Sequence, residues 1–256
     1  PAWQRSNRRR LPDLSEGYSM SKPVVTVVVP TYNERETIVA LIGEILSSWP
    51  GINILVVDDA SPDETAREVL LAFPDHERVN VLVRKGKRGR GLAGREGFQR
   101  ALESGSDIVG EMDADFSHHP RFIPSLVAAL EDADVAIGSR YLPGGGLAER
   151  GWLRTLVTGT ARFYLNLWLG LKLTDPTSGF RFFRKEALRP VLPLLEADDP
   201  FIVTELLFHL RRSGNRIVEV PIYFYQRRAG KSKLKVTTLC RYLWRVICLR
   251  WKWRGR

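Results

Sequence analysis

Asp113 and Asp115 stand one residue apart, directly after the strand-like run at residues 107–112. Residues i and i+2 of an extended chain share one face, so the two carboxylates point the same way. Such a pair can hold a hard divalent cation with help from substrate phosphates, which suits Mg²⁺ or Mn²⁺. His118 and His119 follow and suggest a rival, a transition-metal site with Asp and His ligands. A solvated acidic loop is the remaining alternative.

Polar residues also follow the first two strand-like runs. At the end of the first run, Asn33 is predicted to be a helix N-cap, with Glu36 completing a capping box. That role leaves Tyr32 and Glu34 unexplained, and these two could face a nucleotide base. After the second run, Asp58 or its neighbour could accept hydrogen bonds from a base or a ribose, as acids at this place do in nucleotide-binding folds. A solvated turn is the alternative for these acids.

The segment 85–97, KGKRGRGLAGREG, is rich in glycine and positive charge. It does not fit a P-loop, because no G-K-[ST] closes it. Its density of charge favours a flexible, solvated loop over a phosphate cradle.

The elements that must position these residues alternate between strand and helix. The continuous β-branched run at 24–29 predicts a strand buried on both faces, as in parallel sheets. Further strands are predicted at 52–58, 79–83, 107–112 and 134–138. Helices are predicted at 33–48, from Ser61 with Pro62 in the first turn, at 92–104 and at 120–131. Five alternations indicate a doubly wound, mostly parallel α/β sheet, in which ligands bind beyond the carboxyl ends of the strands. The polar residues at those ends are Asn33, Glu34, Asp58, Asp59, Asp113, Asp115 and Arg140.

Beyond residue 145 the pattern changes. It predicts an amphipathic helix at 152–169, a strand at 179–184, a helix at 201–213 and an extended segment at 216–226. Because no linker rich in Pro, Gly and Ser separates this half, it should form a layer on the same sheet, giving a single domain over residues 22–236. No apolar run approaches the roughly 18 residues that a membrane-spanning helix needs.

Positive charge is concentrated at the C-terminal end. Residues 227–256 contain 11 of the 39 Lys and Arg and none of the 29 Asp and Glu, so the rest of the chain is close to neutral. This distribution argues against a nucleic-acid-binding groove and favours an anionic surface contacted at one end. Residues 1–21 are polar and basic, and we expect a disordered arm that lies partly ahead of a native start at Met20. Cys240 and Cys248 would lie about 12 Å apart on one helix, too far for a disulfide, which favours a reducing compartment.

The tail, residues 237–256, has the pattern of an amphipathic helix. Arg241, Arg245 and Lys252 fall within about 40° of one another around a helix axis. The opposite side carries Leu239, Leu243, Val246 and Ile247, flanked by Trp244, Trp251 and Trp253. Basic residues beside tryptophans are typical of a helix that lies in a membrane interface. A helix docked on the protein core is the alternative.

Six ordered motifs make the chain resemble the polyprenol-phosphate (dolichol-phosphate) mannosyltransferases, which are family 2 inverting glycosyltransferases of the GT-A fold. The motifs are VPTYNE (29–34), DDASPD (58–63), MDADFSHHP (112–120), GSRY (138–141), DPTSGFR (175–181) and GKSKL (230–234). The resemblance runs over residues 24–234. It departs at Arg90, which stands in place of the usual leucine, and at Ser117, where some relatives place a glutamine near the metal.

The resemblance also implies a site. Asp113 and Asp115 would bind Mg²⁺ or Mn²⁺ on the diphosphate, and Arg140 and Arg227 would complete the catalytic set. The nucleotide sugar would contact Pro30, Tyr32, Glu34, Asp58, Asp113, Ala114, Asp115, Arg140, Arg154, Arg227 and Lys233. Contacts with the acceptor and its phosphate are assigned to Asp175, Ser178, Glu205 and Ser232. Without the resemblance, Glu205 would be taken as an acid on the surface of a helix.

The implied reaction is the transfer of a sugar, mannose from GDP-mannose in the best-known members, to polyprenyl phosphate. A UDP-sugar donor carrying glucose or an N-acetylhexosamine is the alternative within the same class. From other classes, a catalytically silent regulatory subunit and a nucleic-acid-binding protein stay open. The nucleic-acid-binding protein would use the basic tail and would stack bases on the aromatic residues of GFRFF (179–183). We expect a peripheral protein on the cytoplasmic face of a membrane, with a membrane-anchored partner protein and no bound nucleic acid.

Overall fold

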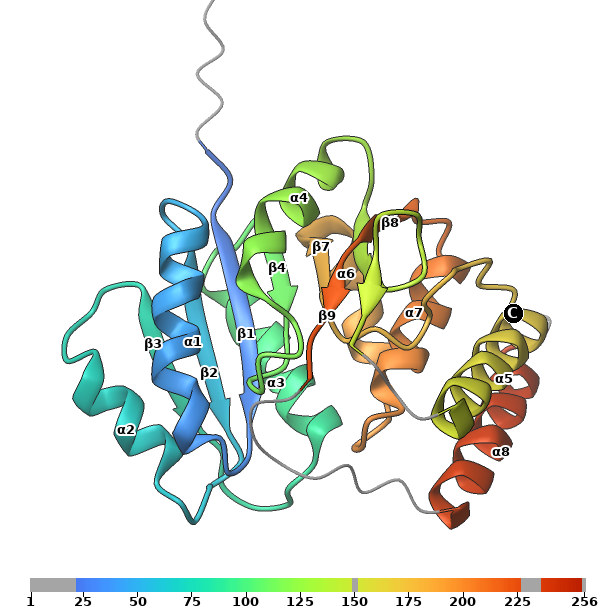
Figure 1. Ribbon diagram of the computed structural model, residues 1–256, viewed down its shortest axis with the longest axis horizontal. Helices are drawn as coiled ribbons and strands as arrows, with labels where there is room; N and C mark the ends of the chain where they lie inside the picture. Colours follow the sequence, from blue (N-terminus) through green and yellow to red (C-terminus); the bar gives the residue numbers. More distant parts are fainter. Residues whose placement is uncertain (1–21, 149–151, 227–235, 255–256) are drawn as a thin grey trace, which may run out of the picture.

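The structure, a computed structural model, describes residues 22–148, 152–226 and 236–254 (Figure 1). Its central sheet has seven strands in the order β3-β2-β1-β4-β7-β5-β8. The strands are β1 (Val25–Thr31), β2 (Asn53–Asp58), β3 (Val79–Val83), β4 (Ile108–Glu111), β5 (Val135–Ser139), β7 (Arg181–Arg184) and β8 (Ile217–Pro221). Neighbouring strands are parallel except at β7, which runs antiparallel to β4 and β5. A second sheet pairs β6 (Gly146–Leu147) with β9 (Tyr223–Phe224).

Helices cover both faces of this sheet (Figure 1). They are α1 (Arg35–Ser48), α2 (Thr65–Ala72), α3 (Arg90–Glu103), α4 (Ile123–Ala128), α5 (Trp152–Leu169), α6 (Lys185–Val191), α7 (Ile202–Arg212) and α8 (Val236–Lys252), with short 3₁₀ turns at Pro120–Phe122, Ala129–Glu131 and Leu192–Leu194. Alternate residues of β1 face opposite sides. Val28 joins a core with α3, α5, α6 and α7, whereas Val27 and Val29 join a second core with α1 and α4. The prediction of a doubly wound, mostly parallel sheet is therefore confirmed.

The predicted helix caps are wrong, because the polar side chains after β1 and β2 bond across the two loops. Asn33 has a φ of 62°, and α1 begins only at Arg35. The N–H groups of Asn33 and Arg35 donate to Ser61 Oγ (3.0 Å) and to Asp63 Oδ2 (3.2 Å). Helix α2 begins at Thr65, not at Ser61. The DDASPD segment thus caps the helix that follows β1, and it places the two loops side by side.

The second half of the glycine-rich segment is helical, since α3 begins at Arg90, where a flexible loop was predicted. Gly91 and Gly97 are buried in α3. A Cβ on Gly91 would lie 2.4 Å from the carbonyl oxygen of Ala197, and a Cβ on Gly97 would lie 2.4 Å from Val28 Cγ1. Glycine is present here because the helix backbone approaches the sheet and the 197–199 backbone too closely for a side chain.

The aromatic residues of GFRFF are interior residues. Phe180, Phe182 and Phe183 are all fully buried. They pack in β7 and just before it, so they do not present a surface on which bases could stack. This finding removes one of the two sequence features on which the nucleic-acid-binding alternative rested; the other is the basic tail.

Helix α8 packs beside α5 and belongs to the same hydrophobic core (Figure 1). Val246 and Leu249 are buried in it. Two residues of the predicted basic face meet the protein, because Arg245 pairs with Asp199 at 2.7 Å and Lys252 pairs with Glu196 at 2.5 Å. Helix α8 is therefore docked on the protein core, as in the alternative interpretation, and contact of its basic face with lipid headgroups stays a prediction. None of the described helices has the length and apolar character needed to cross a bilayer.

Candidate active site

The two predicted metal-binding carboxylates follow β4 and differ in exposure. The Asp113 side chain is 34% exposed, whereas Asp115 is buried. Asp115 Oδ1 accepts a hydrogen bond from the backbone N–H of Ser117 at 3.0 Å. Phe116, between Asp115 and Ser117, has a φ of 62°, so the chain turns sharply after the second carboxylate. The buried Ala114 completes the motif.

A guanidinium that the sequence did not identify as functional contacts the first of these carboxylates, Asp113. Arg90 donates from Nη1 to Glu111 Oε1 at 2.6 Å and from Nη2 to Asp113 Oδ1 at 3.2 Å. Burial alone would lower the pKa of Arg90, but the two carboxylates outweigh it and raise that pKa above its ordinary value. The only signal in the sequence was the departure from leucine at this position of the family motif.

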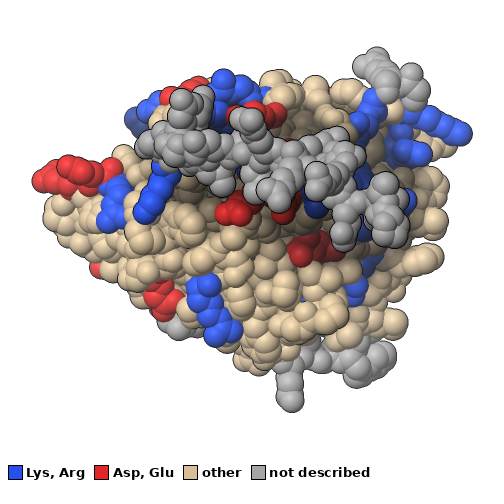
Figure 2. All heavy atoms as spheres, turned by 90° about the horizontal axis from the view of Figure 1, so that it is seen from above, with Lys and Arg blue, Asp and Glu red and all other residues tan. Residues whose placement is uncertain are grey.

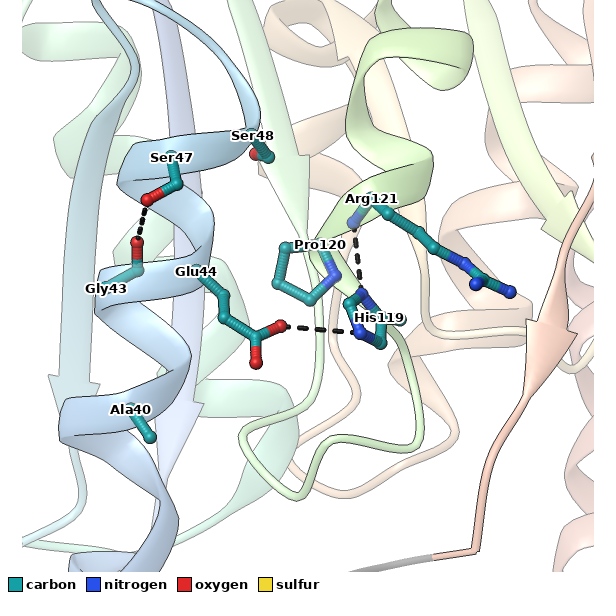
Figure 3. Close-up of a pocket in the computed structure, with 8 residues that line it drawn as sticks. All are labelled: Ala40, Gly43, Glu44, Ser47, Ser48, His119, Pro120 and Arg121. Carbon is teal, nitrogen blue, oxygen red and sulfur yellow. Dashed lines mark hydrogen bonds and ion pairs between the residues drawn. The ribbon is translucent and has the colours of Figure 1, made fainter.

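The two histidines of the motif diverge, which argues against the transition-metal alternative. His118 is buried, stacks on Phe180 at 5.2 Å between ring centroids, and accepts a hydrogen bond at Nδ1 from the backbone N–H of Asp113. Burial lowers the pKa of His118. His119 points instead toward Glu44 of α1, with 3.4 Å between Nε2 and Oε2, in a pocket of about 370 Å³ (Figure 3). Within the described residues, no group of three or more His, Cys, Asp and Glu side chains is arranged to hold a metal.

The acidic pair fits a hard cation such as Mg²⁺ or Mn²⁺ better than it fits a metal that prefers histidine ligands, such as Zn²⁺. These ions take oxygen ligands and are held by one or two carboxylates together with substrate phosphates and water. Ser117 offers a further oxygen, since its Oγ is buried and has no hydrogen-bond partner among the described residues. A buried hydroxyl without a partner is costly unless something else binds it. The donor set present is therefore two carboxylates and a hydroxyl, all hard oxygen ligands.

Arg140 follows β5 and is held rigidly by Asp175. Its Nε and Nη2 donate to the two carboxylate oxygens at 2.6 and 2.7 Å, and Nη2 also donates to Thr177 Oγ1 at 2.8 Å. Both charged residues are buried. Burial would lower the pKa of Arg140, but Asp175 outweighs it and raises that pKa. Asp175 therefore orients Arg140, a role that the sequence did not predict.

The residues predicted to contact the nucleotide differ in their exposure and in their hydrogen-bond partners. Tyr32, 42% exposed, follows β1, and its hydroxyl accepts a hydrogen bond from Arg88 Nη1 at 2.9 Å. Asp58 is buried, and its carboxylate accepts hydrogen bonds from Thr31 Oγ1 and from the backbone N–H of Ser61. Asp58 therefore closes the turn after β2, and its contact with a nucleotide stays a prediction. Arg88 is a cation that the sequence analysis treated only as part of a charged loop.

The remaining nucleotide-site candidates are placed as follows. Pro30 is the next-to-last residue of β1, and Glu34 is the residue before α1. Both lie at the carboxyl end of the sheet, as predicted. Arg154 falls in α5, but its side chain lies outside the described part of the chain, and Arg227, Ser232 and Lys233 lie outside the described residues altogether.

Two of the acceptor-side candidates serve the fold. Glu205 is buried on α7, which corrects the expectation of a surface acid. Its Oε2 accepts hydrogen bonds from the backbone N–H groups of Glu196 and Ala197 at 3.0 and 2.9 Å, and burial raises its pKa. Ser178 is also buried, and its Oγ accepts a hydrogen bond from the N–H of Phe180. Both residues fix loops beside the site, so direct contact with the acceptor stays a prediction.

Comparison with known proteins agrees with this geometry. The family described as Glycosyl transferase family 2 matches residues 26–192. Polyprenol monophosphomannose synthase from Mycolicibacterium smegmatis is 39% identical over 235 residues, which cover 90% of this chain and 87% of the relative. Undecaprenyl-phosphate mannosyltransferase from Micrococcus luteus is 40% identical over 211 residues, which cover 82% of this chain and 87% of the relative. Dolichol-phosphate mannosyltransferase from Pyrococcus furiosus is 37% identical, covering 90% of this chain and 64% of the relative.

A solved structure shares the fold. Glucosyl-3-phosphoglycerate synthase from Mycobacterium tuberculosis, crystallised with Mn²⁺, UDP and phosphoglyceric acid, matches with a TM-score of 0.64 and 22% identity, over 89% of this chain and 77% of that chain. At this identity the likeness shows the fold alone, and it confirms the GT-A-type architecture. With the motifs, the sheet and the close relatives in agreement, the chain belongs to glycosyl transferase family 2.

Proposed function

We propose that this chain transfers mannose from GDP-mannose to polyprenyl phosphate by a single inverting displacement. The observation that carries the proposal is the Asp113–Asp115 pair at the end of β4, in a chain 39% identical to a polyprenol monophosphomannose synthase over most of both lengths. In the reaction, a phosphate oxygen of the acceptor forms a bond to the anomeric carbon. The bond from that carbon to the diphosphate breaks, and its electron pair leaves with the diphosphate.

The leaving diphosphate and the acceptor are both anionic, so the site must supply positive charge. Asp113 and Asp115, with Ser117 beside them, would hold Mg²⁺ or Mn²⁺, which supplies Lewis-acid stabilisation to the diphosphate. Arg140 adds a fixed guanidinium, because Asp175 and Thr177 already hold it in one orientation. A preorganised charge of this kind costs little reorganisation when charge develops.

The acceptor does not require a strong general base. A phosphate monoester has a second pKa of about 6, so its oxygen is already largely anionic at pH 7. Arg227, Ser232 and Lys233 are proposed to bring the phosphates together, as the resemblance implies. Arg154 is proposed to contact the donor from the start of α5.

A lipid acceptor requires contact with a membrane, and α5 and α8 supply a suitable surface. Phe163 and Leu167 of α5 are 70% and 67% exposed, and Trp244 and Trp251 of α8 are 65% and 67% exposed. Positions 163 and 167 of α5 lie one turn apart, and positions 244 and 251 of α8 lie two turns apart, so each pair shares one helix face. Exposed apolar patches of this kind mark interaction surfaces, including membrane-binding ones.

Positive charge lies in the last turns of α7 and α8. Arg211, Arg212 and Arg250 line a pocket of about 280 Å³ together with Trp253. In Figure 2, the right-hand end of the molecule, on the side of α5 and α8, shows Lys and Arg side chains among uncharged residues. Arginines beside tryptophan suit the headgroup region of an anionic membrane. The protein is proposed to bind there peripherally, on the cytoplasmic face and beside a membrane-anchored partner; the exposed thiols of Cys240 and Cys248 fit a reducing compartment.

A transfer assay tests the function. Protein, polyprenyl-phosphate vesicles and Mn²⁺ are incubated with radiolabelled GDP-mannose or, separately, with labelled UDP-glucose or UDP-N-acetylglucosamine, and the lipid fraction is extracted. We expect label in the lipid from GDP-mannose, and loss of at least 99% of it in Asp115→Ala. Lipid labelled only from a UDP-sugar would replace the donor assignment, and no labelled lipid from any donor would overturn the function.

A further inference from the structure

Arg90 occupies a position that the reaction does not explain. It is the first residue of α3, and its guanidinium bridges Glu111 on β4 and Asp113 just after it. The bond to the buried Glu111 is short, at 2.6 Å, and the bond to the more exposed Asp113 is longer, at 3.2 Å. Arg90 is thus anchored at one end and bound less closely at the carboxylate that would hold a cation.

One glycine beside the bridge leaves the room that the guanidinium occupies. A Cβ on Gly94, in the same helix, would lie 3.1 Å from Glu111 Oε1 and 3.4 Å from Arg90 Nη1, which is tight. A Cβ on Gly179 would lie 3.6 Å from Asp113 Oδ2 and 3.7 Å from Arg90 Nη2, which is ordinary contact. The bridge is therefore closely packed on the side of α3.

We propose that Arg90 is an internal counter-ion of the cation site. Its guanidinium holds Asp113, and competes with the divalent ion for that carboxylate, until a nucleotide diphosphate binds. This inference rests on the proposed function. A guanidinium beside Asp113 repels a divalent cation and occupies a lone pair of Oδ1. A bound diphosphate adds negative charge and offers the guanidinium a new acceptor, and charge-assisted bonds from arginine to phosphate are strong. Cation and nucleotide should therefore bind cooperatively, and Arg90 should account for part of that coupling.

The test measures free Mn²⁺ by electron paramagnetic resonance, with and without saturating GDP. The variants are Arg90→Leu and the double variant Arg90→Leu/Glu111→Gln, which removes one charge of each sign and leaves no buried carboxylate unpaired. Arg100→Leu is the control, since Arg100 lies on the same helix, is largely exposed and is 3.8 Å from Glu103. Circular dichroism confirms that each variant is folded.

We expect the double variant to bind Mn²⁺ alone about ten-fold more tightly than the unmodified protein, a size typical of coupling between two sites. With GDP present the difference should shrink, and Arg100→Leu should match the unmodified protein in both conditions. Equal Mn²⁺ affinity in the unmodified protein and the double variant, with binding abolished in Asp113→Asn, overturns the role of Arg90 and leaves the proposed function standing. If neither the unmodified protein nor any variant binds Mn²⁺ even with GDP, both the proposed cation site and the role of Arg90 are contradicted.

Discussion

Arg140 and Asp175 meet through two side-chain hydrogen bonds, of 2.6 and 2.7 Å, although 35 residues separate them in the chain. The Asp175 loop is itself fixed, because the N–H groups of Thr174 and Asp175 both donate to Glu219 of β8 at 2.7 Å. The orientation of Arg140 is therefore set by β8 and by the segment that precedes β7. The proposed contact of this guanidinium with a phosphate would therefore need little rearrangement.

Replacing Asp175 with Asn should leave a buried guanidinium without its counter-charge. Breaking a buried ion pair from one side costs about 3–5 kcal/mol, and we expect a loss of that order in the free energy of unfolding, measured by urea denaturation. Transfer to lipid should fall with it. Thr177→Val removes the hydrogen bonds that Thr177 Oγ1 accepts from Arg140 and donates to Asp175, but it leaves the two charges paired. It should therefore cost less, about 1.5–3 kcal/mol. Equal stability of Asp175→Asn and the unmodified protein would show that the pair does not organise the site.

Gly97 tests the close contact between α3 and the sheet. An alanine Cβ there would lie 2.4 Å from Val28 Cγ1 and 3.0 Å from Val57 Cγ2. We expect Gly97→Ala to lower the free energy of unfolding by about 1–3 kcal/mol through overpacking. Gly43→Ala is the matched control, because Gly43 is in α1 with nothing within 4 Å of the added Cβ. There the gain in helix propensity should stabilise the protein by about 0.5–1 kcal/mol, and the opposite order of the two variants would contradict the packing assignment.

His209 should make stability depend on pH. It is buried on α7, and burial, with Arg212 nearby, lowers its pKa to about 4. Below the ordinary histidine pKa of about 6.5, His209 is protonated in the unfolded chain but stays neutral in the folded protein. Stability contributed by neutral His209 is therefore complete at pH 7 and is lost as the pH falls from about 6.5 toward 4.

Between pH 7 and pH 5 this loss amounts to about 2 kcal/mol for a single histidine. The measurement compares urea denaturation of the unmodified protein and His209→Gln at both pH values. We expect the change with pH to shrink by about that amount in His209→Gln. An unchanged pH dependence in His209→Gln would rule out the buried neutral histidine as its source.

Leu167 and Leu71 offer a matched pair for the membrane surface, since each is 67% exposed but they lie on α5 and α2. Leu167→Glu should weaken binding to anionic vesicles at least about ten-fold, because it removes one apolar side chain from the bilayer interface. Leu71→Glu should have no effect. Co-sedimentation with vesicles measures both, and a fluorophore on the exposed Cys248 reports whether α8 meets the lipid. Equal loss in the two variants would assign vesicle binding to charge alone.

The elements of the fold could be predicted because their signals are local. Continuous β-branched runs gave β1, β2 and β3 within a residue or two, and the amphipathic pattern gave α5 at Trp152–Leu169. Helix starts failed where side chains bonded across loops. Asn33 is a residue type that is preferred at N-caps, yet its backbone N–H donates to Ser61 Oγ, 28 residues away. No spacing rule reports such a contact before the chain is folded.

The candidate site divides in the same way. Asp113, Asp115 and Arg140 could be predicted because they follow strands whose carboxyl ends meet at one edge of the sheet. The partners Asp175 for Arg140 and Arg90 for Asp113 could not, since these pairs depend on where distant segments pack. Glu205 was misjudged because a carboxylate on an amphipathic helix is usually solvated, whereas here it binds the 196–197 backbone. The glycines at 91 and 97 were assigned to flexibility when close packing required them.

The most direct test of the central claim is a crystal structure of the protein with Mn²⁺ and GDP, with diffraction recorded at the manganese absorption edge. We predict an anomalous peak in contact with the carboxylates of Asp113 and Asp115 and with the diphosphate, and no such peak in crystals of Asp115→Asn grown in the same way. A fully occupied GDP with no anomalous density at these two side chains would contradict the account.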